Sequence, residues 1–481
     1  MAAVRLLDSS GNPMRRESRN VQSHHEIRAR YDAAQTTAEN SNHWAQADGF
    51  GARLANSPDV RKKLRERARY ERDNNCYCGG MVETIANDVI GTGPRLQLLT
   101  DDDGINGRVS DAFDDWSAAV GLAEILRTFR EARTVDGEAF ALIDVNPALR
   151  TPVKLTLRLI EADQVTTPGL FVPTRTAVDG IVFDEHLNPL AYHVLLEHPG
   201  DGIGGLLGQR FESIDAGSVI HWFKRRRPGQ CRGVPEITPA LPLYALLRRY
   251  TLATVSAAEI AALFAAIVKS NLPPDDDDPG VTPFDTTALV RGMMTFLPDG
   301  YDAMQMRAEQ PTTTYPAFKR EIICEIAKCV NVPYNVAAGN SSEYNYSSGR
   351  LDHQVYHRAI GVDRYHLETA VLDRVLVEWF REVRLAAPGI VEGLDPNRIA
   401  KHAWHWDGFA HVDPQKEAAA QATRLANGTT TLADEWAEAG YDWREKADQQ
   451  AREREYYAQR GMSYPGDVGV SVGSTQPETS K

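Results

Sequence analysis

Two cysteines separated by one residue, Cys76 and Cys78, have the residue type and spacing that could hold a metal ion. Together with Cys324 and Cys329 they would offer zinc a set of four thiolate ligands. Structural zinc sites usually place about two to four residues between the cysteines of a pair, so the C-x-C spacing fits poorly. We therefore expect no metal.

Two glycine-rich stretches raise the question of phosphate binding: GTG at 91–93 and GIGGLLGQ at 202–209. Neither belongs to a G-x-x-x-x-G-K-[ST] motif, and the second lacks the G-x-G-x-x-G register. We therefore expect no cofactor, and we interpret Gly91 and Gly93 as a turn that follows a helix.

The serines of NSSEYNYSSGR, residues 340–350, could act as nucleophiles with His353 or His357 as the base. The sequence identifies neither an acid to orient the histidine nor an oxyanion donor. The acidic run at 275–278 could bind a divalent cation, although a solvated loop is the commoner structure for such a run. We expect the protein not to be an enzyme.

One compact basic patch occurs, in KRRRPGQCRG at 224–233, and a solvated turn is an equally good interpretation of it. His221, beside Trp222 in a predicted strand, is expected to be packed rather than to bind a metal. The members of the possible basic patch are Lys224, Arg225, Arg226, Arg227 and Arg232.

The elements that must position these residues follow from apolar spacing. Helices are predicted from about 59 to 90 with Gly91 as the C-terminal cap, from 238 to 270, from 318 to 330, from 348 to 384 with only Gly361 interrupting, and in short segments after 413. Strands are predicted in KLTLRL, on both sides of an Asn188-Pro189 turn, in SVIHWF and in GMMTFL. The pattern between about 134 and 225 predicts a mixed α+β domain.

The overall charge limits the partners. Lys and Arg number 53 against 66 Asp and Glu, which gives a net charge of −13. This sign excludes a broad grip on a phosphate backbone, so any contact with DNA must be local or sliding. The 481 residues, 42% of them apolar, suit a soluble globular protein of about three domains.

Nothing in the sequence predicts secretion or a membrane span. The N-terminal MAAVRLLDSSGNPMRR lacks the apolar run of a signal peptide, and IAALFAAIV at 260–268 is too short to cross a bilayer. Five cysteines, an odd number, without a secretory signal indicate a reducing cytoplasm.

Five stretches occur in a characteristic order: ARYERDNNCYCGGMVETIANDVIGTGPRLQ, TVDGEAFALI, VIHWFKRRRPGQCRGVP, IAKCVNVPYNVAAGNSSEYNYSSGR and VDPQKEAAAQATRLANGTTTLADEWAEAGYDW. Together they resemble the lambda-type family of bacteriophage portal proteins over roughly residues 60–450. The chain departs from the family at Cys76 and Cys78, where other small residues or proline are expected. It also departs at Asn331, which stands in place of the glycine of Gly-Val-Pro, so the turn before the polar loop is expected to have a different shape.

The resemblance implies an α+β portal-type subunit with a mixed α/β wing, a helical stem, a small clip, a long tunnel helix and a helical C-terminal crown. The implied domains are an N-terminal arm at 1–59, a wing at 60–235, stem helices at 236–270 and 314–331, a clip at 271–313, a channel loop at 332–347, a tunnel helix at 348–384, a return segment to the wing at 385–412, crown helices at 413–465 and a tail at 466–481.

The resemblance also implies a function. Such a protein forms a homo-oligomeric ring of about twelve subunits at one capsid vertex. Double-stranded DNA passes through it without sequence recognition, packaged by a terminase motor and later ejected. The implied partners are the terminase, the major capsid or scaffold protein, and head-completion and tail adaptor proteins, with no membrane. The protein would be made in the host cytoplasm and reside in the virion.

Under this implication the polar loop would meet the duplex without reading bases. Tyr344 and Tyr346 would be its bulky contacts, and Arg350 would form a local positive ring or an intersubunit pair. The predicted channel residues are Asn340, Ser341, Ser342, Glu343, Tyr344, Asn345, Tyr346 and Arg350.

Two other function classes stay open. One is a soluble hydrolase or nucleotide-dependent enzyme with its site on the α+β part. The absence of a complete set of catalytic or nucleotide-binding motifs argues against this class. The other is a monomeric nucleic-acid-binding adaptor, for which the acidic net charge is a poor qualification.

Overall fold

Helix α3 (Cys76–Ile90), which begins with the two cysteines, confirms the helix predicted from the apolar spacing. The Asn75 side chain caps its first turn by accepting hydrogen bonds from the backbone N–H groups of Tyr77 and Cys78. Gly91 ends the helix with φ +57°, a conformation that glycine adopts without steric cost. The GTG stretch is therefore a helix end.

The structure is a computed structural model that describes residues 42–45, 47–167, 176–201, 210–263, 267–270, 301–304, 314–342, 344–396, 398–409 and 413–465. The chain divides into two units, 1–51 and 52–481, and every described helix and strand lies in the second. The acidic run at 275–278, GMMTFL and the glycine-rich stretch at 202–209 lie outside the described residues.

The strands form small antiparallel sheets, which confirms a mixed α and β architecture. A three-stranded sheet has the order β3-β2-β8, and a four-stranded sheet has the order β4-β5-β6-β7. Two separate two-stranded sheets are formed by β1 with β11 and by β9 with β10. The strands are β1 (Arg95–Leu98), β2 (Glu138–Val145), β3 (Leu155–Ile160), β4 (Ala177–Val178), β5 (Ile181–Phe183), β6 (Pro189–Leu195), β7 (Phe211–Asp215), β8 (Val219–Phe223), β9 (Ile267–Ser270), β10 (Tyr301–Met304) and β11 (His402–His405).

Helices pack against the three-stranded sheet and enclose a large hydrophobic core. This core contains three buried tryptophans: Trp116 on α4 (Asp103–Val120), Trp222 on β8, and Trp379. Neither α4 nor α5 (Leu122–Asp136) was predicted; α5 replaces the start of the strand region that was expected from residue 134. The remaining helices before the stem are α1 (Ala52–Ala55) and α2 (Pro58–Asn74).

A buried ion-pair cluster joins β2 to the residues that follow β8. The fully buried Glu138 carboxylate accepts from Arg232 Nη2 at 2.8 Å and from the Gly233 backbone N–H at 2.9 Å, and it lies 3.1 Å from His221 Nε2. Burial alone would raise the pKa of Glu138, but Arg232 and His221 hold that pKa well below its usual range. The His221 ring stacks on Phe140, as expected of a packed histidine.

Arg232 is therefore not part of an exposed basic patch. Its side chain is 1% exposed and is enclosed by Glu138 and by the backbone carbonyls of Val165 and Ala162. The prediction that placed Arg232 in the basic patch was wrong, because the local sequence does not show whether an arginine in a polar turn is buried or exposed. Arg232 is buried because it pairs with Glu138, which lies 94 residues away in the chain.

A second buried cluster joins α5, the residue before the stem and the long helix α10 (Tyr346–Leu367). Arg130 and Arg133 each contact both Glu236 and Asp363, at distances of 2.7–3.2 Å. Burial opposes ionisation of Glu236, yet the two arginines lower its pKa to about 2. This cluster holds the base of the stem against α10.

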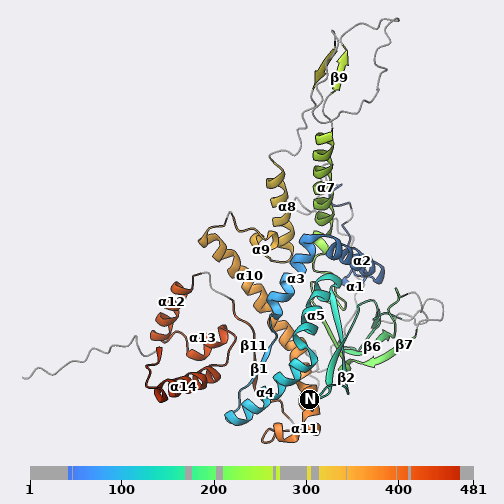
Figure 1. The fold of residues 1–481 in the computed structure, drawn as a ribbon. Coiled ribbons are helices and arrows are strands. Elements are labelled where there is room, and N and C mark those ends of the chain that lie inside the picture. The colour runs from blue at the N-terminus through green and yellow to red at the C-terminus, as the bar shows by residue number, and fades with distance from the viewer. Residues whose placement is uncertain are drawn as a thin grey trace, which may run out of the picture. The chain divides into compact units, whose positions relative to one another are not determined.

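The segment predicted as the first stem helix begins with a 3₁₀ turn (Thr238–Ala240) and continues as α7 (Leu241–Leu263). The helix predicted to reach residue 270 is wrong at its end, because residues 267–270 form β9, which pairs with β10. The second predicted helix is confirmed as α8 (Tyr315–Cys329), and it packs beside α7 (Figure 1). None of the described helices is long and apolar enough to span a membrane.

The long helix predicted at 348–384 is α10 followed by one π-helical turn (Glu368–Leu372) and α11 (Asp373–Ala386). The helix is irregular at this π-helical turn and not at Gly361. A glycine inside a helix lowers its stability but can keep helical dihedral angles, so it need not interrupt the helix. After β11 the chain forms α12 (Pro414–Ala426), α13 (Leu432–Glu438) and α14 (Trp443–Gln459), which confirms the short helices predicted after residue 413.

Gly137→Ala is expected to be severely destabilising. Gly137 has φ +87°, and a Cβ placed there would overlap the backbone of Val234 and Pro235, which the Glu138 cluster holds in place. We expect the free energy of unfolding, measured by urea denaturation, to fall by at least about 2 kcal/mol. Gly107→Ala in α4, where a Cβ meets only open space, is the control and should be neutral or stabilising by up to about 1 kcal/mol.

Candidate functional site

The polar segment before α10 is shorter than predicted, because helices occupy both of its ends. Residues 334–338 form α9 (Tyr334–Ala338), and α10 begins at Tyr346. Tyr346 and Arg350 therefore belong to the first turns of a helix and not to a loop, which corrects the predicted loop boundary at 347. Glu343 lies outside the described residues.

The turn before this segment keeps a glycine-like conformation. Asn331 has φ +58° in the left-handed region, which asparagine tolerates better than most residues with a side chain. The neighbouring Val332 is buried. A different shape for this turn was the expectation, but the asparagine adopts a backbone angle that glycine would also adopt.

Asn345 starts α10 as its N-terminal cap. Its side-chain oxygen accepts from the Ser348 backbone N–H at 2.8 Å, and the Ser348 hydroxyl donates to the Asn345 carbonyl at 3.2 Å. These bonds satisfy donors that the first helical turn leaves open. They also occupy Ser348 with a structural role, so the structure gives no support to this serine as a nucleophile.

The exposed residues of the segment are mostly uncharged. Asn340, Ser341 and Ser342 are exposed, whereas Tyr344 is partly buried and donates to Asp352 Oδ2 at 3.1 Å. Burial and this hydrogen bond raise the pKa of Tyr344. Arg350 is exposed and makes no hydrogen bond or ion pair within the described part of the chain.

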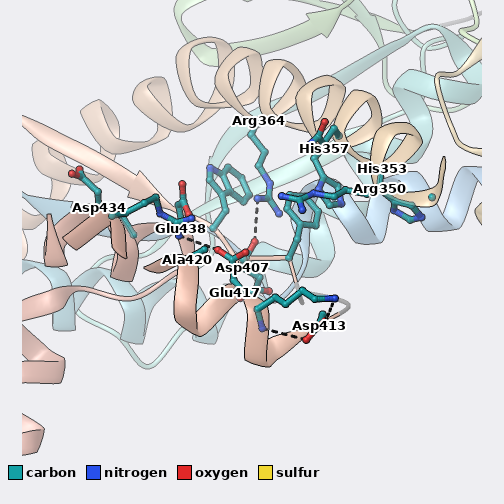
Figure 2. A pocket seen from close by; sticks show the side chains of 18 of the residues that line it. Arg350, His353, His357, Arg364, Asp407, Asp413, Glu417, Ala420, Asp434 and Glu438 are labelled. Atoms are coloured by element: carbon teal, nitrogen blue, oxygen red, sulfur yellow. Dashed lines mark hydrogen bonds and ion pairs between the residues drawn. The ribbon is translucent and has the colours of Figure 1, made fainter. Parts of the chain in front are cut away.

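A cavity of about 1280 Å³ lies between α10, the residues after β11, and the helices α12 and α13. Figure 2 shows that basic side chains project into it from α10 and that acidic side chains face them from the other wall. The basic wall consists of Arg350, His353, His357 and Arg364. The acidic wall carries Asp407, Asp413, Glu417, Asp434 and Glu438, together with Lys416 and Arg424, which pair with Asp413 and Glu417.

Several of these groups already have partners that fix the walls. His353 Nε2 lies 3.1 Å from the side-chain nitrogen of Asn335, and the His357 ring stacks on Phe409 with centroids 3.8 Å apart. Asp407 accepts from the backbone N–H and the hydroxyl of Thr92 at 2.6 and 2.8 Å. The cavity is therefore a preformed part of the fold.

The Arg364 side chain connects α10 to the C-terminal end of α3 by hydrogen bonds. Its guanidinium donates to the backbone carbonyls of Val89, Asp88 and Asp407 at 2.9–3.1 Å. A cation at a helix C-terminus is favourable because the last carbonyls lack helical partners. Burial lowers the pKa of Arg364.

The basic patch is reduced to Lys224, Arg225, Arg226 and Arg227, all of which are exposed. Arg225 lies over the ring of Phe223, and Arg226 Nη2 donates to the Pro235 carbonyl at 3.1 Å. The patch and the polar segment before α10 are separate, since none of these four patch residues lines the cavity beside α10.

The cysteines do not form a metal site in the described part of the protein. Cys76 is exposed, while burial raises the pKa of the Cys78 thiol to about 12. All five thiols are free, and Cys324 and Cys329 belong to no group of potential metal ligands among the described residues.

Glu161, Asp163 and His198 are the only described residues that bring three potential ligand groups together. Arg69 Nη2 already pairs with Glu161 at 3.1 Å and with Asp163 at 2.8 Å. A guanidinium in this position supplies the charge that a cation would bring, so the group is an ion-pair cluster.

Sequence reasoning missed the acidic wall of the cavity. Asp407 follows β11, and Glu417, Asp434 and Glu438 belong to the helices predicted as the crown, for which no individual residue was assigned a role. The Asp-Pro-x-Lys-Glu run at 413–417 was the one available signal. Asp413 caps α12 by accepting from the Lys416 backbone N–H at 3.2 Å.

Asn345→Ala is expected to lower the free energy of unfolding by about 1 kcal/mol, the usual cost of a lost N-terminal cap. The first turn of α10 should lose amide protection first, and hydrogen exchange of residues 346–350 measures this. Asn340→Ala is the matched control, because Asn340 bonds only within the exposed turn. Equal exchange in both variants would contradict the capping role.

Comparison with known proteins gives one family match. The sequence profile described as "Phage portal protein, lambda family" matches residues 41–364. No curated protein matched the chain.

Several solved structures are similar to it at low sequence identity. They include "Virion of native gene transfer agent (GTA) particle" (TM-score 0.44, 13% identity, 77% of this chain and 91% of that chain), "Neck of empty GTA particle computed with C6 symmetry" (0.45, 16%, 76% and 90%) and "Neck of native GTA particle computed with C12 symmetry" (0.44, 14%, 78% and 91%).

Proposed function

The chain belongs to the lambda family of phage portal proteins, and from this membership we propose that it forms a ring at one capsid vertex through which double-stranded DNA enters and leaves. The single observation that carries the proposal is the family match, which extends over residues 41–364 and so includes the wing, the stem, the polar segment and most of α10. A portal of this kind is a structural component of the virion and a connector between head and tail.

Within this proposal the polar segment at 339–345 and the start of α10 meet the DNA. The supporting features are exposed uncharged side chains and the exposed guanidinium of Arg350, which has no partner in the part of the chain that the structure describes. Uncharged contacts leave the duplex free to slide, whereas a basic wall would bind its phosphates and release their counterions. The net charge of −13 per chain has the sign that low friction requires.

The remaining parts receive roles by family membership. Residues 60–235 form the wing, α7 and α8 the stem, and the residues between them the clip, where the terminase and later the head-completion and tail adaptor proteins dock. The helices α12, α13 and α14 form the crown. The major capsid or scaffold protein is the proposed partner of the outer wing, and synthesis takes place in the bacterial cytoplasm before incorporation into the virion.

DNA packaging with purified proheads and terminase tests the proposal. Deletion of residues 340–344 and, separately, Arg350→Ala are expected to slow packaging several-fold, and Arg350→Ala, an exposed substitution, should leave the free energy of unfolding within about 0.5 kcal/mol. Arg225→Ala on the exposed patch is the matched control and should package at the parental rate. If both channel variants also package at that rate, the DNA-facing assignment of this segment is wrong.

A further inference from the structure

Helix α10 has an apolar face that no described part of the subunit covers. It buries Tyr356 and Ile360, while the opposite face exposes Leu351, Val355, Val362 and Tyr365 by 56–68% each. With Arg358 these positions follow one another in steps of four, three, four and three residues. Such spacing is typical of a helix that packs lengthwise against another helix.

Helix α3 exposes a face with the same spacing. Its buried residues, such as Val82 and Ile85, point into the core. On the other side Cys76, Gly80, Glu83 and Asn87 are all exposed, in steps of four, three and four residues. These side chains are small or polar, which suits a helix that receives larger side chains from a neighbour.

Three α-helical glycines in the described part of the subunit, Gly80 on α3, Gly107 on α4 and Gly361 on α10, have open space where a Cβ would lie, and two of them belong to the helices described above. A Cβ added at Gly80 on α3 or at Gly361 on α10 would meet no atom within 4 Å, and neither residue has a positive φ. Glycine in an exposed helix is destabilising relative to alanine, so the subunit alone gives no reason for it. Gly79, by contrast, lies close to the Arg72 carbonyl. Close approach by another chain explains the open positions on α3 and α10.

The two faces also have complementary charges. Arg358 is the third position of the α10 face and Glu83 is the third position of the α3 face. Both are exposed, and neither makes an ion pair within the described residues. Aligned in parallel from Leu351 and Cys76, the two series bring Arg358 and Glu83 opposite each other.

We propose that the apolar face of α10 packs in parallel on the exposed face of α3 in a second copy of this chain, with Arg358 beside Glu83 of the partner subunit. Val355 then occupies the space above the partner's Gly80. In Figure 1 both helices run from the α8–α9 end of the unit toward α11, so a copy rotated about an axis that runs along these helices presents α3 in the same sense. The contact joins two different surfaces, so repeating it builds a ring and not a closed dimer. This inference rests on the proposed function and names the surfaces that form the ring.

Charge reversal at the central pair tests the contact. Arg358→Glu places two carboxylates together, and Glu83→Arg places two guanidinium groups together, so each variant alone should need at least about tenfold higher concentration to form rings. An equimolar mixture should assemble like the parent. When the two variants alternate around the ring, the introduced glutamate meets the introduced arginine at one contact and the native Arg358 meets the native Glu83 at the next. Both positions are exposed, so each variant should unfold at the parental urea concentration.

A crosslink tests the register independently. Leu351→Cys should form an intersubunit disulfide with the native, exposed Cys76 when an oxidant is added, giving a ladder of oligomers on non-reducing gels. The ladder should disappear when Cys76→Ser is added. Asp352→Cys, one residue away and facing a different direction on α10, is the matched control and should give no ladder.

The outcomes separate this inference from the function on which it rests. A parent protein that forms no rings would overturn the proposed function itself. If the parent forms rings while the charge-reversed variants assemble normally, or the mixture fails to restore assembly, or the Leu351→Cys variant gives no ladder, then the α10–α3 contact is wrong and the portal function stands.

Discussion

Replacing Glu138 by Gln is expected to lower the free energy of unfolding by about 3–5 kcal/mol, because it leaves the buried Arg232 without its counter-charge. The Glu138 carboxylate is fully buried and is the acceptor for Arg232 and for the Gly233 backbone N–H. Urea denaturation of the unassembled subunit at neutral pH measures the effect. Arg158→Ala, which breaks an exposed ion pair with Asp144, is the control and should cost no more than about 1 kcal/mol.

The same cluster makes a prediction about pH. The pKa of Glu138 is depressed in the folded protein, so its contribution to stability is present above the unfolded-state pKa of about 4.3 and is lost as the pH falls below that value. Between about pH 7 and pH 3 the parent should therefore lose more stability than Glu138→Gln does. Parallel stability curves for the two proteins, or equal losses in Glu138→Gln and Arg158→Ala, would contradict the buried ion pair.

Asp363→Asn is expected to cost about 3 kcal/mol and to loosen α10 from α5 and the stem base. The carboxylate of Asp363 lies 2.7 Å from both Arg130 and Arg133, which would be left with Glu236 alone. Hydrogen exchange should show the largest loss of protection in α10. Glu378→Gln, in an exposed pair with Arg381, is the control and should leave exchange unchanged.

Acid sensitivity checks this second cluster. The pKa of Glu236 is lowered to about 2, so its stabilising contribution is present above about pH 4.3 and disappears as the pH falls toward 2. A variant already weakened by Asp363→Asn should reach its acid-unfolding midpoint at a higher pH than the parent. If the midpoint stays in place and α10 keeps its protection, the cluster does not hold α10 to the stem.

The sequence predicted the helices and strands best where apolar periodicity was long and its ends were marked. Gly91 ends α3 where predicted, and β5 and β6 lie on both sides of the predicted turn, although the turn spans residues 184–188 and Pro189 already belongs to β6. Helices α4 and α5 were missed because no cap signal was recognised, although Asp102 caps α4 by accepting from Ile105. The end of the α7 helix was placed too late because alanine-rich composition continues where the backbone changes to β9.

The sequence predicted which segment forms the candidate site, but not the roles of the individual residues in it. Residues 340–350 were singled out from their polar composition, but Asn345 as a cap and Tyr346 as a helical residue depend on where α10 begins. Arg232 was assigned to the surface because its partner Glu138 is distant in the chain. The residues that carry the family resemblance, such as Glu138, Arg232 and Asn345, have structural roles as buried charges and caps.

Assembly of this chain into a ring with a channel can be measured on the purified protein. Size-exclusion chromatography with light scattering, followed by electron microscopy of the same peak, should show an annular particle of about a dozen subunits with a central opening. A stable monomer that forms no rings at high protein concentration would contradict it.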